Sequence, residues 1–544
     1  MNKIENITGH VVDIINTRIY PAKLVIKDGK IQDIIESEDV ENQYIMPGFI
    51  DAHIHIESSL LTPAEFARLA IRHGTIATIS DPHEIANVLG KKGVEFMHRS
   101  GELSPFKFYF GAPSCVPATP FDNAGAELDA QSIEELIKQY QLKYVSEMMN
   151  FPGVINEEKG VIDKLKVAEK HHLPVDGHIP GVTGDALENY IRHGINTDHE
   201  TANLAEAEEK IRRGMKILIR EGSAAKSFDE LLPLIEKYPG HTMLCSDDIH
   251  PDDLLNGHMN VLIKRGIAQD VKLFNLLRTC ILNPVRHYQL DVGLLRLQDD
   301  ADFIVTNDLV NFEVKKTVIR GILLFDGHQT SIPHYKEKLL NKFVAQDINT
   351  SMLQVRSTGK PIHVIQAFDK QLETGSMTVN PKTNKGYIMP DTEGDILKLV
   401  YVSRYQKSNP AVAFVHGFGF NRGAMATSIS HDSHNIIAVG TNDEDIAEVI
   451  NEIMKSKGGI AIKADTIQKL PLRMAGIISD EPFEKVIKDY SLLKQKATEI
   501  GSKFASPFMT LSFMALLVIP ELKISDNGLF DVTKFEAINL HIED

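Results

Sequence analysis

Two histidines, His53 and His55, stand two positions apart at the end of a short apolar run. If the run is a β-strand, both side chains point to the same face and can bind one metal ion. Such a pair is weak support by itself, because 22 histidines in 544 residues supply roughly one H-x-H by chance. The pair indicates a metal site only if further ligands come to the same place.

Further metal-binding side chains follow other apolar runs. Glu147, His178, His199 and Asp247 each stand at or just after the end of a predicted strand. The spacing of the three cysteines matches neither a disulfide framework nor a C-x-x-C metal site: Cys115, Cys245 and Cys280. Any metal in this protein is therefore held by nitrogen and oxygen.

The elements that must position these residues form a regular pattern. Between residues 49 and 300, short apolar runs alternate with amphipathic stretches of helical length, which predicts a (β/α)8 catalytic barrel. The predicted strands cover residues 48–53, 76–80, 106–110, 142–146, 173–177, 195–198, 215–220 and 243–246. The carboxyl ends of all barrel strands open onto one face, so the candidate ligands would surround one pocket. Each of them alone could merely hydrogen-bond a loop or cap a helix, but their joint arrangement favours a metal centre.

Several motifs resemble those of a known superfamily. The segment Pro47-Gly-Phe-Ile-Asp-Ala-His-Ile-His55 is similar to the first-strand signature of the amidohydrolase superfamily, as are Asp247 in Cys-Ser-Asp-Asp and the pair Asn283-Pro284. Within that superfamily, five segments resemble the bacterial adenine deaminase family: residues 80–88, 113–117, 176–180, 220–224 and 431–435.

The resemblance implies a ligand set for two divalent cations. His53, His55 and Asp247 would hold one cation, His178 and His199 the other, and Glu147 would bridge both. Many binuclear relatives use a carboxylated lysine as the bridge, but Lys143 comes too early on its strand to serve. Such donors suit manganese or iron best, with zinc as an alternative.

The resemblance also implies an activity, the hydrolytic deamination of adenine to hypoxanthine and ammonia in purine salvage. A water shared by two cations would lose a proton near neutral pH and attack the purine ring as hydroxide. Ammonia leaves only after its nitrogen is protonated, so an acid–base group must stand nearby. Asp247 is expected to transfer this proton beside the bridging Glu147, and the alternative is that Asp247 is only a ligand.

Further side chains are candidates for contact with adenine or for a lid. The expected substrate-binding residues are Asp81, His83, Glu84 and Glu221. Alternatively, Asp81 and Pro82 simply begin a helix. His431 and His434 follow the glycine-rich residues 416–419 and would form a lid over the barrel mouth, from the same or a neighbouring subunit; the alternative is a tight loop between two strands.

The barrel segment is flanked by regions with a different pattern of apolar and turn-forming residues. Short β-like runs with turn signals occur in residues 1–48 and 301–344, which together would form a small β-sandwich domain. Residues 345–544 mix β-like and helical runs and predict a separate C-terminal α+β domain. The extra domain makes a homo-oligomer the expected assembly.

The amino-acid composition limits the classes of molecule that this protein is expected to bind. The formal charge of −16, from 58 Lys and Arg against 74 Asp and Glu, disfavours nucleic acid and anionic membranes and favours a small-molecule substrate. The first residues carry charges throughout and have no apolar signal region, so the expected location is the cytoplasm. The longest apolar stretch, residues 513–519, is far below the roughly 20 residues of a membrane helix.

Two rival functions remain open. A cyclic amide hydrolase, such as a dihydroorotase or hydantoinase, uses the same hydroxide, although the missing lysine and the motifs above disfavour it. A catalytically silent metal-binding scaffold is the rival of another class, and the retention of all six candidate ligands argues against it. A cytidine-type deaminase is excluded, because the sequence has no C-x-x-C, and a serine hydrolase is disfavoured, because it has no G-x-S-x-G.

Overall fold

A parallel barrel forms the centre of the computed structural model, which describes residues 2–119, 121 and 123–542. Each of the eight runs predicted as a strand overlaps one. The strands are β6 (Phe49–Ile54), β7 (Thr75–Ser80), β8 (Lys107–Phe110), β9 (Val145–Met148), β10 (Val175–Gly177), β11 (Thr197–Asp198), β12 (Lys216–Arg220) and β13 (Thr242–Cys245).

The barrel strands pair in parallel in the order of the chain. Where the ladders are short, single parallel bridges join the next strand, such as Ala112 with Val145 and Val175 with Ile195. Ile54 at the end of β6 bridges Asp247 just after β13, so the last strand returns to the first and the ring closes. Because all strands run in one direction, their carboxyl ends share one face of the barrel.

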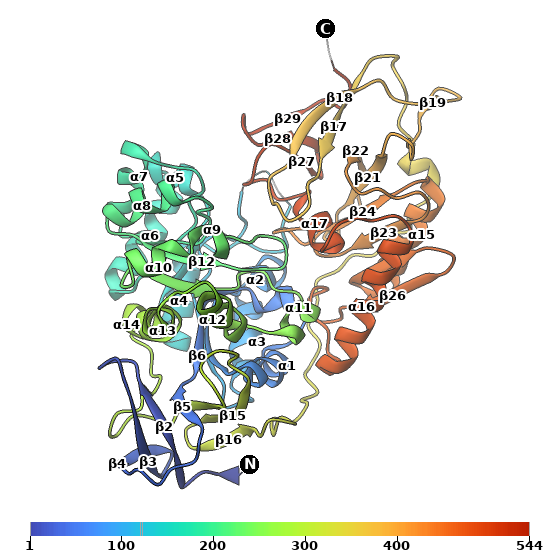
Figure 1. Cartoon of the computed structure of the whole chain (residues 1–544). Helices are drawn as coiled ribbons and strands as arrows, with labels where there is room; N and C mark the ends of the chain where they lie inside the picture. Colours follow the sequence, from blue (N-terminus) through green and yellow to red (C-terminus); the bar gives the residue numbers. More distant parts are fainter. Residues whose placement is uncertain (1, 120, 122, 543–544) are drawn as a thin grey trace.

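Helices follow the barrel strands and surround them (Figure 1). Polar residues at three helix starts, Thr62, Asp129 and Asn203, accept a hydrogen bond from the first turn and so fix where the helix begins. The helices are α1 (Pro63–Ala70), α2 (His83–Leu89), α3 (Lys91–Gly101), α4 (Ala130–Tyr140), α5 (Phe151–Ile155), α6 (Lys159–His171), α7 (Gly184–Ile191), α8 (Leu204–Arg212), α9 (Phe228–Leu231), α10 (Pro233–Lys237), α11 (Pro251–Asn256), α12 (Met259–Ala268), α13 (Leu273–Leu277) and α14 (Asn283–Tyr288).

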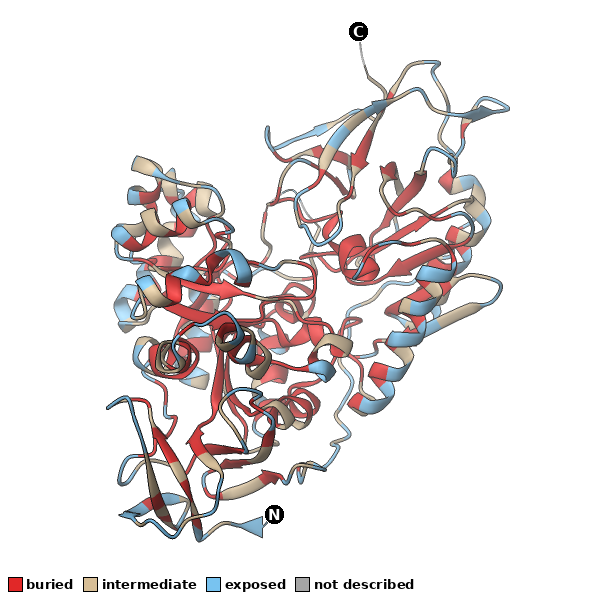
Figure 2. Cartoon of the chain, viewed as in Figure 1, coloured by how far each residue is buried: buried red, intermediate tan, exposed pale blue. Residues whose placement is uncertain are grey.

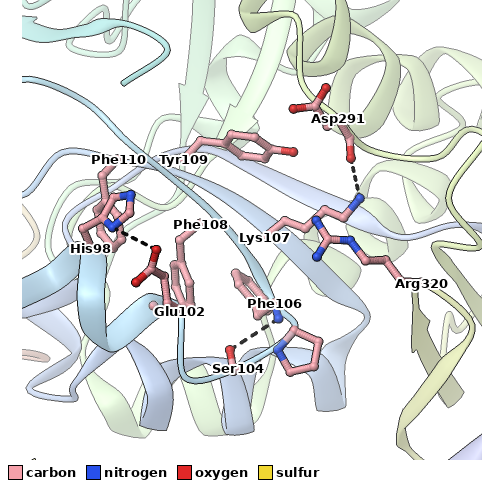
Figure 3. Close-up of a pocket in the computed structure, with 12 residues that line it drawn as sticks. His98, Glu102, Ser104, Phe106, Lys107, Phe108, Tyr109, Phe110, Asp291 and Arg320 are labelled. Atoms are coloured by element: carbon pink, nitrogen blue, oxygen red, sulfur yellow. Dashed lines mark hydrogen bonds and ion pairs between the residues drawn. The ribbon is translucent and has the colours of Figure 1, made fainter. Parts of the chain in front are cut away.

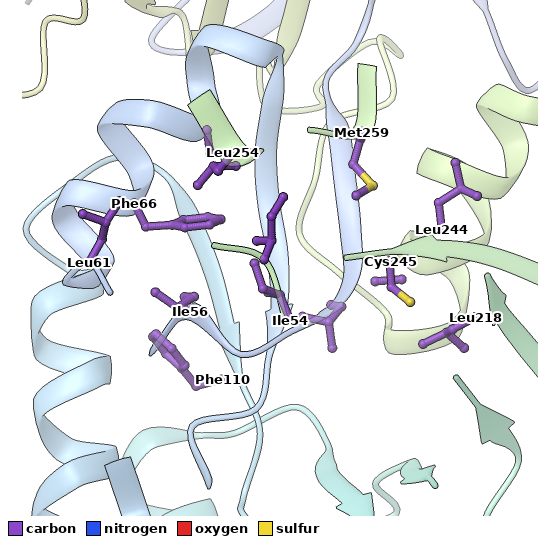
Figure 4. Close-up of a cluster of buried hydrophobic side chains, with 14 of the residues drawn as sticks. Ile54, Ile56, Leu61, Phe66, Phe110, Leu218, Leu244, Cys245, Leu254 and Met259 are labelled. Carbon is purple, nitrogen blue, oxygen red and sulfur yellow. The ribbon is translucent and has the colours of Figure 1, made fainter. Parts of the chain in front are cut away.

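Apolar side chains from strands and helices meet between the barrel and its helices. Figure 4 shows Ile54 of β6, Phe66 of α1 and Met259 of α12 in one such cluster, all buried. The cluster extends into the C-terminal region, where it includes Leu511, and buried residues fill the contact between the two regions (Figure 2). Burial of this apolar surface holds the C-terminal region against the barrel.

The two flanks of the barrel segment share one eight-stranded sheet. Its strand order is β1-β16-β15-β14-β5-β2-β3-β4, and β14 pairs antiparallel with β5. It stays a prediction that these flanks form a β-sandwich domain made of residues 1–48 and 301–344. The strands are β1 (Asn2–Lys3), β2 (Asn6–Asp13), β3 (Arg18–Lys27), β4 (Lys30–Glu36), β5 (Tyr44–Pro47), β14 (Phe303–Thr306), β15 (Val314–Ile319) and β16 (Ile322–Phe325).

A segment with no helix or strand, residues 326–349, then runs past the barrel helices to the C-terminal region (Figure 1). It is tied down by polar contacts: His334 Nδ1 lies 2.9 Å from Glu65 Oε1 of α1, and Ser100 of α3 donates to Glu337 over 2.7 Å. Among the described helices, none is long and apolar enough for a membrane crossing.

The C-terminal region is built on a second eight-stranded sheet, in the order β18-β17-β22-β21-β24-β23-β25-β26. Its strands are β17 (Ile362–Gln366), β18 (Gly375–Val379), β21 (Ile396–Val402), β22 (Ala411–His416), β23 (Ala424–Thr427), β24 (Ile436–Gly440), β25 (Gly459–Lys463) and β26 (Ile467–Pro471). Helix α15 (Asp443–Ser456) packs on β23, β24 and β25. Helices α16 (Phe483–Glu499) and α17 (Pro507–Phe513) and a small sheet of β27 (Leu522–Ser525), β28 (Gly528–Asp531) and β29 (Glu536–Ile538) complete it.

Candidate metal centre

The barrel brings all six predicted ligands together at the carboxyl ends of its strands. His53 is in β6 and His55 follows it, Glu147 is in β9, His178 and His199 follow β10 and β11, and Asp247 follows β13. All six are buried, with exposed fractions of 5% or less. Burial of so many ionisable groups is costly unless they pair or bind a cation.

Glu147 lies at the centre of the group, and its two oxygens face different histidines. Oε1 lies 3.1 Å from His55 Nε2 and 3.8 Å from His53 Nε2. Oε2 lies 2.9 Å from His178 Nδ1 and 3.2 Å from His199 Nε2. One carboxylate therefore joins two separate histidine pairs.

Asp247 completes the first histidine pair. Its Oδ1 lies 3.4 Å from His53 Nε2 and 3.1 Å from His55 Nε2. Backbone hydrogen bonds lock it to the first strand, since Asp247 N donates to His53 O over 2.9 Å and His55 N donates to Asp247 O over 3.1 Å. Its φ of 57° is in the left-handed region, which aspartate adopts more readily than most other non-glycine residues.

The strand before His178 requires a glycine. A Cβ on Gly177 would lie 2.3 Å from Thr197 O on the neighbouring strand β11, well inside van der Waals contact. The backbones of β10 and β11 therefore approach closely only because residue 177 has no side chain. This approach places His178 and His199 beside the same oxygen of Glu147.

Electrostatics favour the ionised forms of the two central carboxyl groups. Burial acts to raise the pKa of Glu147, but the charge of His199 and hydrogen bonds from His178 and His199 outweigh it and hold the pKa well below its ordinary value. Burial also opposes ionisation of Asp247, and there the charge of Arg220 and the close approach of His53 and His55 lower the pKa. Both carboxylates are thus available as anionic ligands.

The spacing of these donors fits metal ions. Two ligands about 2.1 Å from one cation, at angles of 90–109°, lie about 3.0–3.4 Å from each other. The contacts of Glu147 and Asp247 with the histidines span 2.9–3.8 Å. Within the described residues, both ring nitrogens of His53 and Nε2 of His178 lack a hydrogen-bond partner. The donor set therefore fits two cations, with Glu147 between them.

The pocket above these ligands has a polar and an apolar wall. His83 and Glu84, at the start of α2, line it together with His431 and Asp432 of the C-terminal region. His431 Nδ1 lies 2.7 Å from Glu84 Oε1, and His434 lies against the other oxygen of Glu84. The apolar wall comes from the same region: Leu372, Phe513, Leu516 and Ile519. The C-terminal region of the same chain therefore reaches the barrel mouth.

Two of the expected substrate-binding residues do not line this pocket. Asp81 is fully buried and accepts hydrogen bonds from the backbone N and Nδ1 of His83, both over 3.1 Å, so it positions His83. Glu221 does not line the pocket. Side chains alternate along β12, so Arg220 points to the ligands while Glu221 turns outward to Arg265 of α12, 2.5 Å away.

Sequence reasoning missed three charged residues of the site. Arg220 contacts both Glu200 and Asp247, Glu200 directly follows His199, and Asp248 directly follows Asp247. Burial and the neighbouring charge of Asp247 raise the pKa of Asp248 to about 6. The alternation along β12 and the adjacency of the two acids to predicted ligands were the signals that could have found them.

Comparison with known proteins agrees with this geometry. The amidohydrolase family matches residues 44–324, and the adenine deaminase C-terminal domain matches residues 371–536. A protein from Salinibacter ruber named adenine deaminase is 47% identical over 540 residues, covering 99% of each chain. The chain belongs to the adenine deaminase family of amidohydrolases. The resemblance predicted from the motifs is thereby confirmed, and the site is that of a metal-dependent enzyme family with a small-molecule substrate.

Other relatives cover the chain to a similar extent. A protein of the same name from Methanosarcina mazei is 48% identical over 550 residues, covering 98% of this chain and 99% of the relative. Among solved structures, the β-aspartyl dipeptidase of Fervidobacterium islandicum AW-1 is 14% identical, with a TM-score of 0.46 over 62% of this chain and all of that chain.

A wider cavity lies away from the metal centre. It has a volume of about 400 Å³ and is lined by residues of α3 and β8 together with Asp291 and Arg320 (Figure 3). Its polar groups pair with one another: Lys107 donates to the backbone O of Asp291, and His98 lies 3.6 Å from Glu102. It contains none of the predicted ligands, so we place the chemistry at the smaller pocket.

Proposed function

We propose that this protein hydrolyses adenine to hypoxanthine and ammonia. The observation that carries the proposal is Glu147, whose two oxygens each face one histidine pair. The names of relatives that share 47–48% of its residues over nearly the whole chain support the choice of adenine. The reaction consumes one water and exchanges the amino group at C6 for oxygen.

Six side chains would hold two divalent cations. His53, His55 and Asp247 would bind one, His178 and His199 would bind the other, and Glu147 would be shared by both. Manganese or iron is the proposed metal, with zinc as the alternative, because imidazole and carboxylate donors suit all three. When bound, the cations supply Lewis acidity, which can lower the pKa of water to about 7.

Asp247 is the proposed proton carrier. Its Oδ1 faces the His53–His55 pair, so it stands beside the place where water is activated. It takes one proton from the attacking water and delivers it to the leaving amino group, which departs as ammonia. Arg220 donates to Oδ2 over 2.7 Å and keeps the carboxylate oriented during this transfer.

The pocket walls would hold the purine. Leu372 and Phe513 provide apolar surface for the ring faces, and His83 and Glu84 provide polar groups for the ring edge. Asp248 also lines the pocket and is a further proposed contact. Asp81 acts on the substrate only through His83.

The C-terminal region is the proposed lid. The loop that carries His431 and His434 contacts Glu84 from the same chain. We propose residues 49–300 as the catalytic barrel and residues 345–544 as the lid-bearing domain, which the family match to residues 371–536 supports. Residues 1–48 with 301–344 would form the flanking domain.

Ammonia release from adenine tests the proposal directly. The purified chain is loaded with Mn²⁺ or Fe²⁺ without oxygen and assayed beside Glu147→Gln, Asp247→Asn and the matched outer-face variant Glu221→Gln. We expect turnover in the parent and in Glu221→Gln, and a loss of at least about 10²-fold in the two ligand variants. Metal-replete protein that ignores adenine but opens a cyclic amide would overturn the assignment.

A further inference from the structure

A buried lysine of the C-terminal region lies behind the apolar wall of the pocket. Lys523 is in β27, and its side chain is 0% exposed. Its Nζ donates to the backbone O of Leu372 over 2.8 Å and to the backbone O of Phe513 over 3.0 Å. Both acceptor residues line the pocket at the metal centre, whereas Lys523 itself does not. One amino group is therefore bonded to two segments that supply the apolar wall.

The two segments are distant in the sequence and meet at Lys523. Leu372 lies in the loop between β17 and β18, 151 positions before Lys523, and Phe513 ends α17, 10 positions before it. The loop is docked on the same strand by Thr374, which donates through Oγ1 to Leu522 O over 2.8 Å. The side chains of Leu372 and Phe513 pack in one apolar cluster. The spacing between loop and helix is thus set where they share the amino group.

Packing alone does not explain a lysine at this position. The two acceptors described for its amino group are neutral backbone oxygens, whereas fully buried lysines usually pair with a carboxylate. Burial lowers the pKa of Lys523 to about 7, against a partial opposing effect of Glu373, an exposed residue. A methionine would fill similar space without the cost of burying an amino group. The lysine is therefore explained by what its N–H groups hold, and these donate whether or not the amine carries a charge.

The position of Phe513 affects both walls of the pocket. Phe513 is the last residue of α17, and the last carbonyl groups of a helix need a partner from outside it. Its ring stacks on the imidazole of His431, with centroids 4.6 Å apart and planes 18° from parallel. His431 in turn contacts Glu84 of the polar wall. A donor that fixes the end of α17 therefore fixes the junction of the apolar and polar walls.

We propose that Lys523 is a positioning residue for the substrate, which holds Leu372 and Phe513 at the separation that fits the faces of the purine ring. This inference rests on the proposed function, which assigns the apolar wall to adenine. Lys523 acts through the two carbonyl oxygens and touches neither the substrate nor the proposed metal ligands. Its loss loosens the wall before and during the reaction alike, so binding of the substrate weakens while the chemistry at the metal centre continues.

Steady-state kinetics of the full-length, Mn²⁺-loaded protein test the proposal. For Lys523→Met we expect KM for adenine to rise at least about tenfold, while kcat changes less than about threefold. Lys398→Met is the matched control, because Lys398 is a second buried lysine of the C-terminal region, 1% exposed. It donates to Leu353 O over 2.9 Å and contacts Asp443, neither of which lines the pocket. Lys398→Met should keep the KM of the parent, even if it lowers stability.

Crystal structures of the parent and of Lys523→Met show the wall independently of any substrate. We expect the backbone of Leu372 or of Phe513 to shift in the variant. An unchanged KM, an equal rise of KM in Lys398→Met or an unshifted wall would overturn the proposal. A parent that leaves adenine intact would instead overturn the proposed function, and the crystal structures would still decide the role of Lys523. If Lys523→Met does not fold, Lys523→Gln and Lys398→Gln replace the two methionine variants, because the shorter glutamine does not reach both carbonyls.

Discussion

Arg220 donates through Nη1 to Oδ2 of Asp247 over 2.7 Å, at the mouth of the barrel. The same guanidinium donates to both oxygens of Glu200, over 2.5 and 2.8 Å. All three side chains are 6–8% exposed. A buried cation that is shared by two carboxylates orients both of them, and one of these is a proposed metal ligand.

Replacing Arg220 by methionine should therefore affect both stability and activity. Removing one partner of a buried pair leaves the other charge unpaired and costs about 3–5 kcal/mol in the free energy of unfolding. We expect a 10–100-fold loss in kcat/KM for adenine as Asp247 loses its orientation. Thermal unfolding and steady-state kinetics of the metal-loaded variant measure the two effects.

A neighbouring arginine provides the control. Arg265 pairs with Glu221 on the outer side of β12, and its side chain is 31% exposed. Arg265→Met should cost about 0–1 kcal/mol and leave kcat/KM unchanged. Equal effects of the two substitutions would show that Arg220 has no special role.

Metal removal should lower the melting temperature. Binding to the folded state alone adds about 2.7 kcal/mol per site when the free metal is 100 times its Kd. We expect treatment with a chelator to lower the melting temperature by several degrees and added Mn²⁺ to restore it. In Glu147→Gln the response should shrink strongly, because both histidine pairs lose their shared ligand. A chelator effect of equal size in parent and variant would contradict the bridging role.

Gly177→Ala should disturb the second histidine pair. The new Cβ would meet Thr197 O at 2.3 Å, so β10 and β11 must separate. Overpacking of this kind costs about 1–3 kcal/mol, and binding of the cation at His178 and His199 should weaken. Gly160→Ala in α6 is the control: nothing lies within 4 Å of its added Cβ, and the change should be neutral or stabilising by about 0.5–1 kcal/mol. Titration with Mn²⁺ followed by calorimetry separates the two variants.

Lys523 should make stability depend on pH. It is fully buried and donates to the backbone oxygens of Leu372 and Phe513, over 2.8 and 3.0 Å. Burial lowers its pKa to about 7, against a partial opposing effect of Glu373. Because the unfolded chain keeps the ordinary, higher pKa, the unfolded state binds more protons between about pH 7 and 10, and stability rises with pH in that window.

The expected gain approaches 1.4 kcal/mol per pH unit for this one group. Melting temperatures of the parent and Lys523→Met between pH 7 and 9 test it: the parent should gain relative to the variant as the pH rises. Lys503→Met, at an exposed position, should follow the parent. Parallel curves for the parent and Lys523→Met would refute the prediction.

The candidate ligands on the barrel strands were readable from local sequence. His53 and His55 share a face because side chains alternate along a strand, and the ends of parallel strands meet at one face of a barrel. Glu147, His178, His199 and Asp247 follow the same rule: the four histidines lie around Glu147, and Asp247 lies beside His53 and His55. Because side chains alternate every two residues along a strand, a few residues of sequence are enough to show which of them share a face.

The remaining parts of the site depend on packing between distant segments. Whether Arg220 or Glu221 faces the candidate ligands depends on which residues of the five-residue strand β12 point inward. A shift of one residue would exchange the two faces. Asp432 meets His83 only because the C-terminal region packs on the barrel mouth, across some 350 positions of sequence. The sequence by itself determined the barrel, its candidate ligands and the family. The tertiary structure alone decided which polar groups close the pocket, because contacts between distant segments follow from the burial of shared apolar surface rather than from any local pattern.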